Sequence, residues 1–195
     1  TQEEIEKINP FDWEKEFKHI LQRGGFSVII GNPPYMKIAK DSSEALAMPA
    51  VCYGAPNLYF LFAAMSLFNL DKQGEMVYII PRSWTSGAYF KAFREYLLTE
   101  GTLRQVHLFV SRDEVFENES VLQETMIIKV DKSNNRGTVK ITSTRSNKDF
   151  NNINTIEVPY NVIVYGVDKY VYLVTTKEEL KVLQTLEKWK DTLPS

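Results

Sequence analysis

The pattern of apolar and polar residues predicts helices that alternate with strands. In the first segment, apolar side chains recur at the spacing of one helix face, at Trp13, Phe17, Ile20 and Leu21. This helix should begin after Asn9-Pro10 and end at Gly24-Gly25. A strand is expected at 26–30. Residues 36–56 then show no consistent period, and we expect a long loop there, either a lid over a binding site or a disordered connector.

The following segments continue the alternation. A helix that starts after Asn57 is apolar on almost every side, as expected for a helix that packs against a buried sheet. A strand at 76–80 and a helix at 88–98 come next. Two strands, 103–109 and 124–130, would form an antiparallel pair at the edge of the sheet. The resulting βαβαββ order is typical of α/β proteins.

The composition changes after Asp131 toward serine, asparagine, lysine and arginine. Strand-like pieces, among them 138–142 and 160–174, precede a last helix at 177–190. We therefore divide the chain into residues 1–132, which carry the α/β pattern, and residues 133–195, a β-rich segment with a helix.

Composition limits the class of protein. With 195 residues, of which 44% are hydrophobic and 12% aromatic, the chain can bury one core. No apolar run approaches the roughly 18 residues that cross a bilayer, and the first residues do not resemble a signal peptide, so we expect a cytoplasmic protein without membrane contacts. One cysteine and two histidines leave no disulfide framework and no clustered metal site.

The motif with the most specific chemical meaning directly follows the strand at 26–30 and its Gly31. It consists of Asn32, Pro33, Pro34 and Tyr35. The exocyclic amine of a nucleobase is a poor nucleophile, because its lone pair is delocalised into the ring. The Asn32 side-chain oxygen and the Pro33 carbonyl could each accept one amine hydrogen and so localise that lone pair. The prolines would hold both acceptors in a stiff corner. A base taken out of its stack could then rest on the ring of Tyr35.

The same four residues also have a purely structural explanation. Asparagine and proline favour turns that end strands, and the tyrosine could be ordinary packing. A chance match of four such residues is expected in about one chain in a thousand or two of this length. We favour the catalytic interpretation, because functional residues of α/β proteins gather at the carboxyl ends of strands.

These residues resemble the N6-adenine DNA methyltransferases of restriction–modification systems, particularly the large fused type IIG or Eco57I-like enzymes. The resemblance covers residues 8–132 and rests on blocks in the order and spacing of that family: Phe11 to Phe17, Gly24 to Tyr35, Asn57 to Phe62 and Ile79 to Trp84. Ser27 stands where the family has an aspartate. The resemblance implies the C-terminal half of a Rossmann-like S-adenosylmethionine-dependent methyltransferase domain with a small β-rich appendage.

The resemblance also implies the roles of individual residues. Phe116 would match an aromatic residue of a later motif of the family, so that Phe116 and Tyr35 would sandwich a flipped adenine. Asn57 and Tyr59 would border the cofactor, S-adenosylmethionine. The glycine-rich turn with which the family approaches that cofactor is absent from this sequence. We therefore expect a fragment that lacks most of the cofactor pocket, is inactive alone, and self-associates through an exposed sheet edge.

Double-stranded DNA is the expected partner. A net charge of −2 is unusual for a free-standing duplex-binding domain, but residues 129–148 are locally basic. The basic residues expected to contact DNA are Lys37, Lys40, Arg82, Arg136, Lys140 and Arg145. A solvated hairpin with basic residues on its exposed face explains 129–148 equally well. Residues 133–195 would connect the catalytic part to a target-recognition domain.

The sequence therefore predicts a site-specific DNA adenine-N6 methyltransferase of a restriction–modification system. Two alternatives stay open. The same corner would suit an adenine in RNA or the amide nitrogen of a protein glutamine. The chain could also be a catalytically inert DNA-binding scaffold that keeps the corner without its chemistry.

Overall fold

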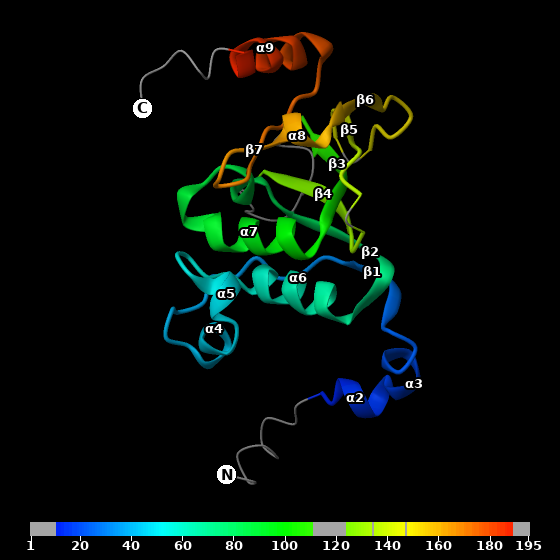
Figure 1. Ribbon diagram of the computed structural model, residues 1–195, viewed down its shortest axis with the longest axis vertical. Coiled ribbons are helices and arrows are strands. Elements are labelled where there is room, and N and C mark those ends of the chain that lie inside the picture. The colour runs from blue at the N-terminus through cyan, green and yellow to red at the C-terminus, as the bar shows by residue number, and fades with distance from the viewer. Residues whose placement is uncertain (1–10, 111–123, 134, 147, 189–195) are drawn as a thin grey trace.

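A computed structural model of the chain describes residues 11–110, 124–133, 135–146 and 148–188 (Figure 1). Its centre is a six-stranded sheet in the order β1-β2-β4-β3-β5-β6. The strands are β1 (Phe26–Gly31), β2 (Leu70–Pro81), β3 (Thr102–Phe109), β4 (Thr125–Asp131), β5 (Thr138–Thr144) and β6 (Asn154–Pro159).

The strand directions decide which residues share an edge of the sheet. β1 is parallel to β2, and β3 is parallel to β5, whereas β4 is antiparallel to both β2 and β3. Consequently β1, β2, β3 and β5 all run the same way. Their carboxyl ends meet at one edge, which we call the carboxyl edge, and in α/β proteins this is the edge that positions functional side chains.

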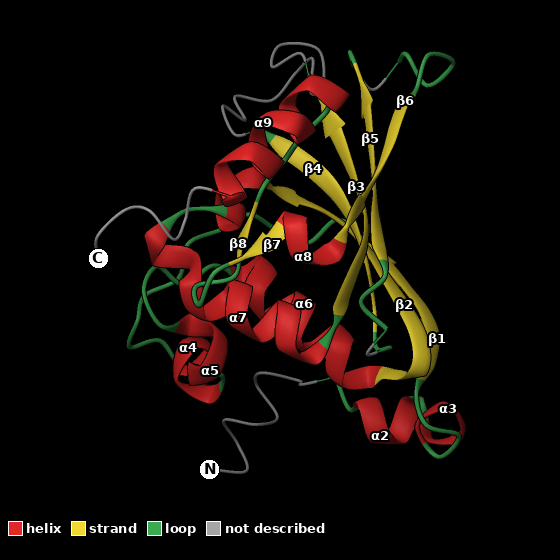
Figure 2. Ribbon diagram, turned by 45° about the horizontal axis from the view of Figure 1, so that its top comes forward, coloured by secondary structure: helices red, strands yellow, loops and turns green. Residues whose placement is uncertain are grey.

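Two long helices, α6 (Leu58–Asn69) and α7 (Lys91–Glu100), cover one face of the sheet (Figure 2). Phe60 from α6 and Phe93 from α7 are both buried and stack with their ring centroids 4.4 Å apart. Met76, Ile80 and other strand residues complete the core below them. Because most side chains of α6 point into this core, its nearly all-round apolar pattern is explained by packing.

Several short elements and one further long helix complete the described chain. They are α2 (Trp13–Glu16), α3 (Lys18–Leu21), α4 (Ser43–Ala47), α5 (Pro49–Cys52), η1 (Arg82–Thr85), η2 (Ala88–Phe90), α8 (Tyr160–Ile163), β7 (Val164–Tyr165), β8 (Tyr170–Val171) and α9 (Lys177–Lys188). Strands β7 and β8 form a separate antiparallel hairpin. None of the helices in the described ranges has the length and apolar character needed to cross a membrane.

The first helix differs from its prediction, since it is divided into α2 and α3 at Phe17. Phe17 leaves helical geometry, with φ −116° and ψ 23°. Its ring packs edge-on against Phe26 at 5.0 Å and lies 5.5 Å from Trp13. The aromatic residues that set the predicted helical period therefore gather into a cluster at the start of β1, and this cluster interrupts the helix.

The expectation of a long loop at 36–56 was wrong, because two short helices, α4 and α5, lie within it. Ser42 caps α4 by accepting a hydrogen bond from the backbone N–H of Ala45. Val51 and Cys52 of α5 are buried. Helices this short have too few residues to show a periodic pattern, so tertiary packing determines them.

The sheet also extends further than the sequence predicted. The pair 103–109 and 124–130 is antiparallel as expected, but it is not at the edge, because β4 lies between β2 and β3 and β3 pairs with β5. Strands β5 and β6 therefore continue the sheet beyond residue 132. Strands on both sides of residue 132 thus belong to one sheet. The division of the chain into two parts at this residue stays a prediction.

Protonation of His107 is expected to destabilise the fold below about pH 6.5. His107 is 6% exposed, its ring nitrogens lie 2.9 Å and 3.1 Å from the hydroxyls of Thr142 and Thr144, and burial lowers its pKa. The unfolded chain takes up a proton first as the pH falls through the ordinary histidine value of about 6.5, so protonation favours unfolding. Urea unfolding at pH 7.5 and 5.5 measures this loss of stability. His107→Gln should reduce it, while His19→Gln, at an exposed position, should not.

Candidate functional site

The corner after β1 lies at the carboxyl edge of the sheet. Asn32 and Pro34 are exposed, Pro33 is buried and Tyr35 is half-buried. The Tyr35 hydroxyl donates to the backbone carbonyl of Ile79 at 2.9 Å and to the Asn32 side-chain oxygen at 3.1 Å. A phenol has one proton, which these two oxygens share. The Asn32 oxygen therefore keeps a lone pair available for another donor.

The Tyr35 side chain is fixed from two sides. Its hydroxyl is held by β2 through Ile79, and its ring meets the ring of Tyr59 edge-on at 6.2 Å. Burial raises the pKa of Tyr35 to about 12, so the hydroxyl stays protonated and remains a donor at neutral pH. The sequence did not predict the contact with Ile79. The parallel pairing of Gly31 with Tyr78 brings the Ile79 carbonyl next to the corner. A prediction that β1 pairs with β2 would therefore have revealed the contact between Tyr35 and Ile79.

The start of α6 lies behind the corner. Asn57 is 7% exposed, and its side-chain oxygen accepts a hydrogen bond from the backbone N–H of Tyr59, so it caps the helix. Tyr59 is 1% exposed and packs edge-on against Phe93, and burial raises its pKa. Both side chains, which the sequence placed beside a cofactor, are thus engaged in the core.

Backbone contacts join the corner to that helix start. The carbonyl of Met36, which follows Tyr35, accepts a hydrogen bond from the N–H of Leu58 at 2.9 Å. The N–H of Ile38 donates to Pro56, and an isolated bridge pairs Lys37 with Asn57. Lys37 and Lys40 themselves are exposed. The segment that leaves the corner is therefore held against the amino end of α6.

The basic residues that were predicted to contact DNA are divided between the two edges of the sheet. Arg82 follows the carboxyl end of β2, where its guanidinium pairs with Glu124 at 2.9 Å. Arg145 follows the carboxyl end of β5 and is exposed, so it shares the edge of the corner. Arg136 precedes β5 at the opposite edge and lies 5.5 Å from the centroid of Tyr160, and exposed Lys140 is near the same end of that strand. Phe116 lies outside the described residues.

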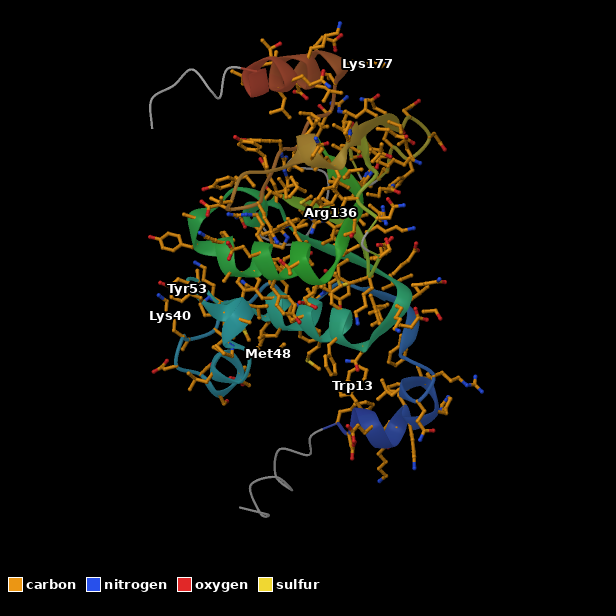
Figure 3. All side chains as sticks on the ribbon, viewed as in Figure 1. Trp13, Lys40, Met48, Tyr53, Arg136 and Lys177 are labelled. Carbon is orange, nitrogen blue, oxygen red and sulfur yellow. The ribbon has the colours of Figure 1, made fainter. Side chains whose placement is uncertain are left out.

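Neither of two further cavities is lined by Asn32, Pro33, Pro34 or Tyr35. One of about 670 Å³ lies between the α4–α5 region and the start of α7, and it is lined by Lys40, Leu46, Cys52, Tyr53, Tyr89 and Glu95 among others. Figure 3 shows Lys40 and Tyr53 together on that side of the molecule. A second, of about 380 Å³, lies beside β1 and is lined by residues that include Trp13, Phe26, Ile30, Phe62 and Tyr78. Within the described ranges, no group of three or more His, Cys, Asp or Glu residues could hold a metal ion.

Two solved structures have a similar fold. A Listeria monocytogenes protein assigned to the class I S-adenosylmethionine-dependent methyltransferases superposes with a TM-score of 0.50 at 13% identity, over 63% of this chain and 38% of its own. The DNA-bound type ISP restriction–modification enzyme LlaBIII gives 0.50 at 14% identity, over 81% of this chain and 13% of its own. At these identities the likeness concerns the fold alone, and it confirms the expected Rossmann-like methyltransferase architecture.

Sequence relatives define the family. The chain is 36% identical over 156 residues to the type II methyltransferase M.BsuBI of Bacillus subtilis, and 36% identical over 158 residues to M.PstI of Providencia stuartii. Each match covers 79% of this chain but 31% of the relative, so the chain spans about a third of the length of these curated relatives. Residues 1–116 match the family model described as Eco57I restriction-modification methylase. The chain therefore belongs to the Eco57I restriction-modification methylase family.

Proposed function

We propose that this chain is the base-binding part of a DNA methyltransferase that transfers a methyl group to adenine N6. The observation that carries the proposal is the corner after β1, where the exposed Asn32 side chain lies beside a tyrosine anchored to β2. The names of the relatives, which are type II methyltransferases, support the reaction class and DNA as the substrate.

The corner would act by alignment. The Asn32 oxygen and the Pro33 carbonyl each accept one hydrogen of the adenine amine, which localises the nitrogen lone pair and aims it at the methyl donor. The ring of Tyr35 supports one face of the flipped base, and Phe116 supports the other. The extra proton on nitrogen can leave after the transfer, so the chemistry needs no carboxylate or histidine base beside Asn32.

S-adenosylmethionine would supply the methyl group. The Asn57 side-chain oxygen caps α6, and the Tyr59 ring is buried in the core. We propose that most of the cofactor pocket lies in the rest of the longer protein. No step at the corner depends on a residue that would hold the cofactor.

The free side of β1 supports the proposal that the isolated chain is incomplete. β1 pairs only with β2 among the described strands, and Val28 and Ile30 are 53% and 76% exposed. An apolar edge strand is a template for pairing with another chain. We therefore expect the isolated chain to be inactive and to self-associate in sedimentation experiments. A folded species that stays monomeric at high concentration would contradict this prediction.

The experiment uses the full-length protein with labelled S-adenosylmethionine and plasmid DNA, followed by digestion to nucleosides. Label in N6-methyladenine is the expected result. Label in another base would overturn the adenine assignment. A folded, cofactor-binding protein that labels RNA or protein and leaves DNA unlabelled would favour the RNA or glutamine alternatives, and one that labels none of them would favour the inert scaffold.

A further inference from the structure

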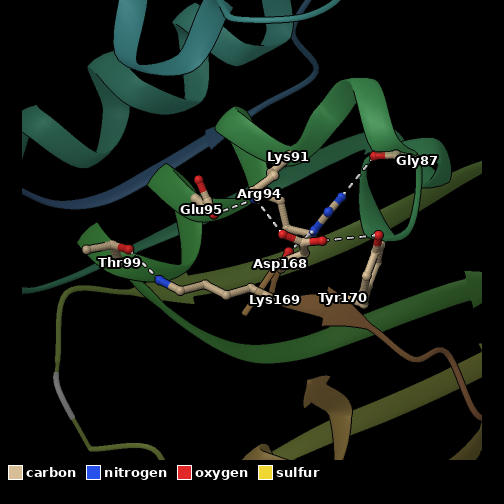
Figure 4. Close-up of polar contacts among 8 residues, drawn as sticks. All are labelled: Gly87, Lys91, Arg94, Glu95, Thr99, Asp168, Lys169 and Tyr170. Carbon is tan, nitrogen blue, oxygen red and sulfur yellow. Dashed lines mark hydrogen bonds and ion pairs between the residues drawn. The ribbon is translucent and has the colours of Figure 1, made fainter. Parts of the chain in front are cut away.

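A buried arginine joins two segments of the fold that are far apart in the sequence. The side chain of Arg94 in α7 is fully buried and donates hydrogen bonds to three backbone carbonyls, of which Figure 4 shows those of Gly87 and Asp168. Nη1 donates to Trp84 at 2.9 Å and to Gly87 at 3.1 Å, and Nε donates to Asp168 at 2.8 Å. Trp84 and Gly87 belong to the turn after β2, whereas Asp168 lies between β7 and β8.

The surroundings of Arg94 hold its side chain in place. Its guanidinium carbon lies 4.7 Å from the ring centroid of Tyr170, a cation–π contact, and the Asp168 carboxylate lies 2.5 Å from the ammonium group of Lys91. Burial lowers the pKa of Arg94, but an arginine remains protonated in proteins. A buried cation of this kind holds its carbonyl partners firmly, because losing them would leave the charge uncompensated.

The turn that Arg94 holds is connected by backbone contacts to the segment leaving the corner. The carbonyl of Tyr89, two residues after Gly87, accepts a hydrogen bond from the N–H of Ala55 at 3.4 Å. Gly54 has a φ of +105°, and a Cβ at this position would lie 2.4 Å from the same carbonyl, so only glycine allows the approach. Pro56 then accepts the bond from Ile38 already described. The contacts thus lead from Arg94 to the residues that follow Tyr35.

We propose that Arg94 is a positioning residue for the base-binding corner, and that the β7–β8 hairpin contributes to methyl transfer through it. This inference rests on the proposed function. It assigns a role to a segment that lies beyond the residues 1–116 matched by the family model. Arg94 touches neither base nor cofactor. It fixes the Trp84–Gly87 turn from the hairpin side, and the turn fixes the segment that leaves Tyr35.

The test is steady-state kinetics of Arg94→Ala in the full-length protein. We expect kcat to fall about ten- to 100-fold, because small misplacements of reacting groups have effects of this size. The KM for DNA should stay within about twofold, since no DNA contact is removed. Exogenous guanidinium at non-denaturing concentration should restore part of kcat by occupying the vacated space, and urea at the same concentration should not.

Two further variants make the result decisive. Arg94→Lys keeps the charge but cannot bridge both segments with a planar fork, so kcat should again fall and guanidinium should not rescue it. Arg104→Ala is the control, because Arg104 pairs with Asp131 at 2.5 Å near the amino end of β3, at the opposite edge of the sheet. Its kcat should be unchanged.

The outcomes separate the inference from the proposed function. Suppose that the wild-type protein methylates adenine, and that both Arg94 variants are folded, as judged by circular dichroism, and have the same kcat as the wild type. The inference is then overturned, while the proposed function stands. If the kcat of Arg94→Ala falls and guanidinium does not restore it, and the kcat of Arg104→Ala falls equally, the effect is a general structural one. This result would also overturn the inference. If the wild type methylates no adenine, the proposed function itself fails.

Discussion

Replacement of Asn32 by alanine is expected to lower kcat for DNA methylation by about 100- to 1000-fold, the size found when one hydrogen-bonding partner of a reacting group is removed. The Asn32 side chain is exposed at the corner, and its oxygen keeps a lone pair beside the Tyr35 hydroxyl. Without that oxygen, one hydrogen of the adenine amine has no acceptor, and the nitrogen lone pair stays delocalised. Single-turnover labelling of plasmid DNA measures the loss.

Affinity for DNA should change little in this variant, because one exposed side chain contributes little to phosphate contacts. Asn69→Ala is the control, since Asn69 is a half-buried asparagine at the far end of α6, where its amide donates to the Met65 carbonyl at 2.8 Å. Its kcat should equal that of the wild type. Methylation of adenine that is insensitive to Asn32→Ala would rule out the mechanism, even though the activity itself would be established.

Replacement of Tyr35 by alanine is expected to weaken capture of the flipped base by roughly five- to 150-fold, which corresponds to about 1–3 kcal/mol of stacking per base. The variant also loses the bond from the Tyr35 hydroxyl to Ile79, which holds the corner against β2. The fluorescence of 2-aminopurine at the target position reports the flipped state directly. We expect strong fluorescence on binding to the wild-type protein and a much smaller change with Tyr35→Ala.

Tyr35→Phe separates the two roles of this side chain. It keeps the ring beside Tyr59 but removes the hydroxyl that contacts Asn32 and Ile79. Base capture should therefore be close to that of the wild type, while kcat falls modestly because Asn32 is less well oriented. If Tyr35→Ala captures the base as well as the wild type does, the ring is not a stacking surface and Tyr35 has a structural role only.

Local patterns were sufficient to predict much of the fold. The strand at 26–30, the helix from Asn57 and the strand at 76–80 are confirmed as β1, α6 and the second half of β2, because continuous apolar runs and a capping asparagine are local signals. The division of the first helix at Phe17 accompanies the packing of its ring against Phe26 of the next strand, and α4 and α5 are too short to show a periodic pattern. No pattern within one segment contains that information.

The arrangement of the candidate site was predictable only in part. A strand followed by Asn-Pro-Pro-Tyr places the corner at a strand end, but its neighbours depend on strand order. The sequence grouped Arg136 with Arg145, although β5 separates them and leaves Arg145 at the carboxyl edge. The role of Arg94 could not be predicted from the sequence, because its carbonyl partners come from the turn after β2 and from the β7–β8 hairpin.

The shared carboxyl edge has a consequence for how such a protein can diverge. Segments that follow β1, β2, β3 and β5 all emerge at this edge, while the buried residues that hold the sheet together lie within the strands and helices. Under the proposed function, insertions in those segments would change the surface around the corner without disturbing the core. Related chains can therefore differ in these connections while keeping the strands and helices that hold Asn32 and Tyr35 in place.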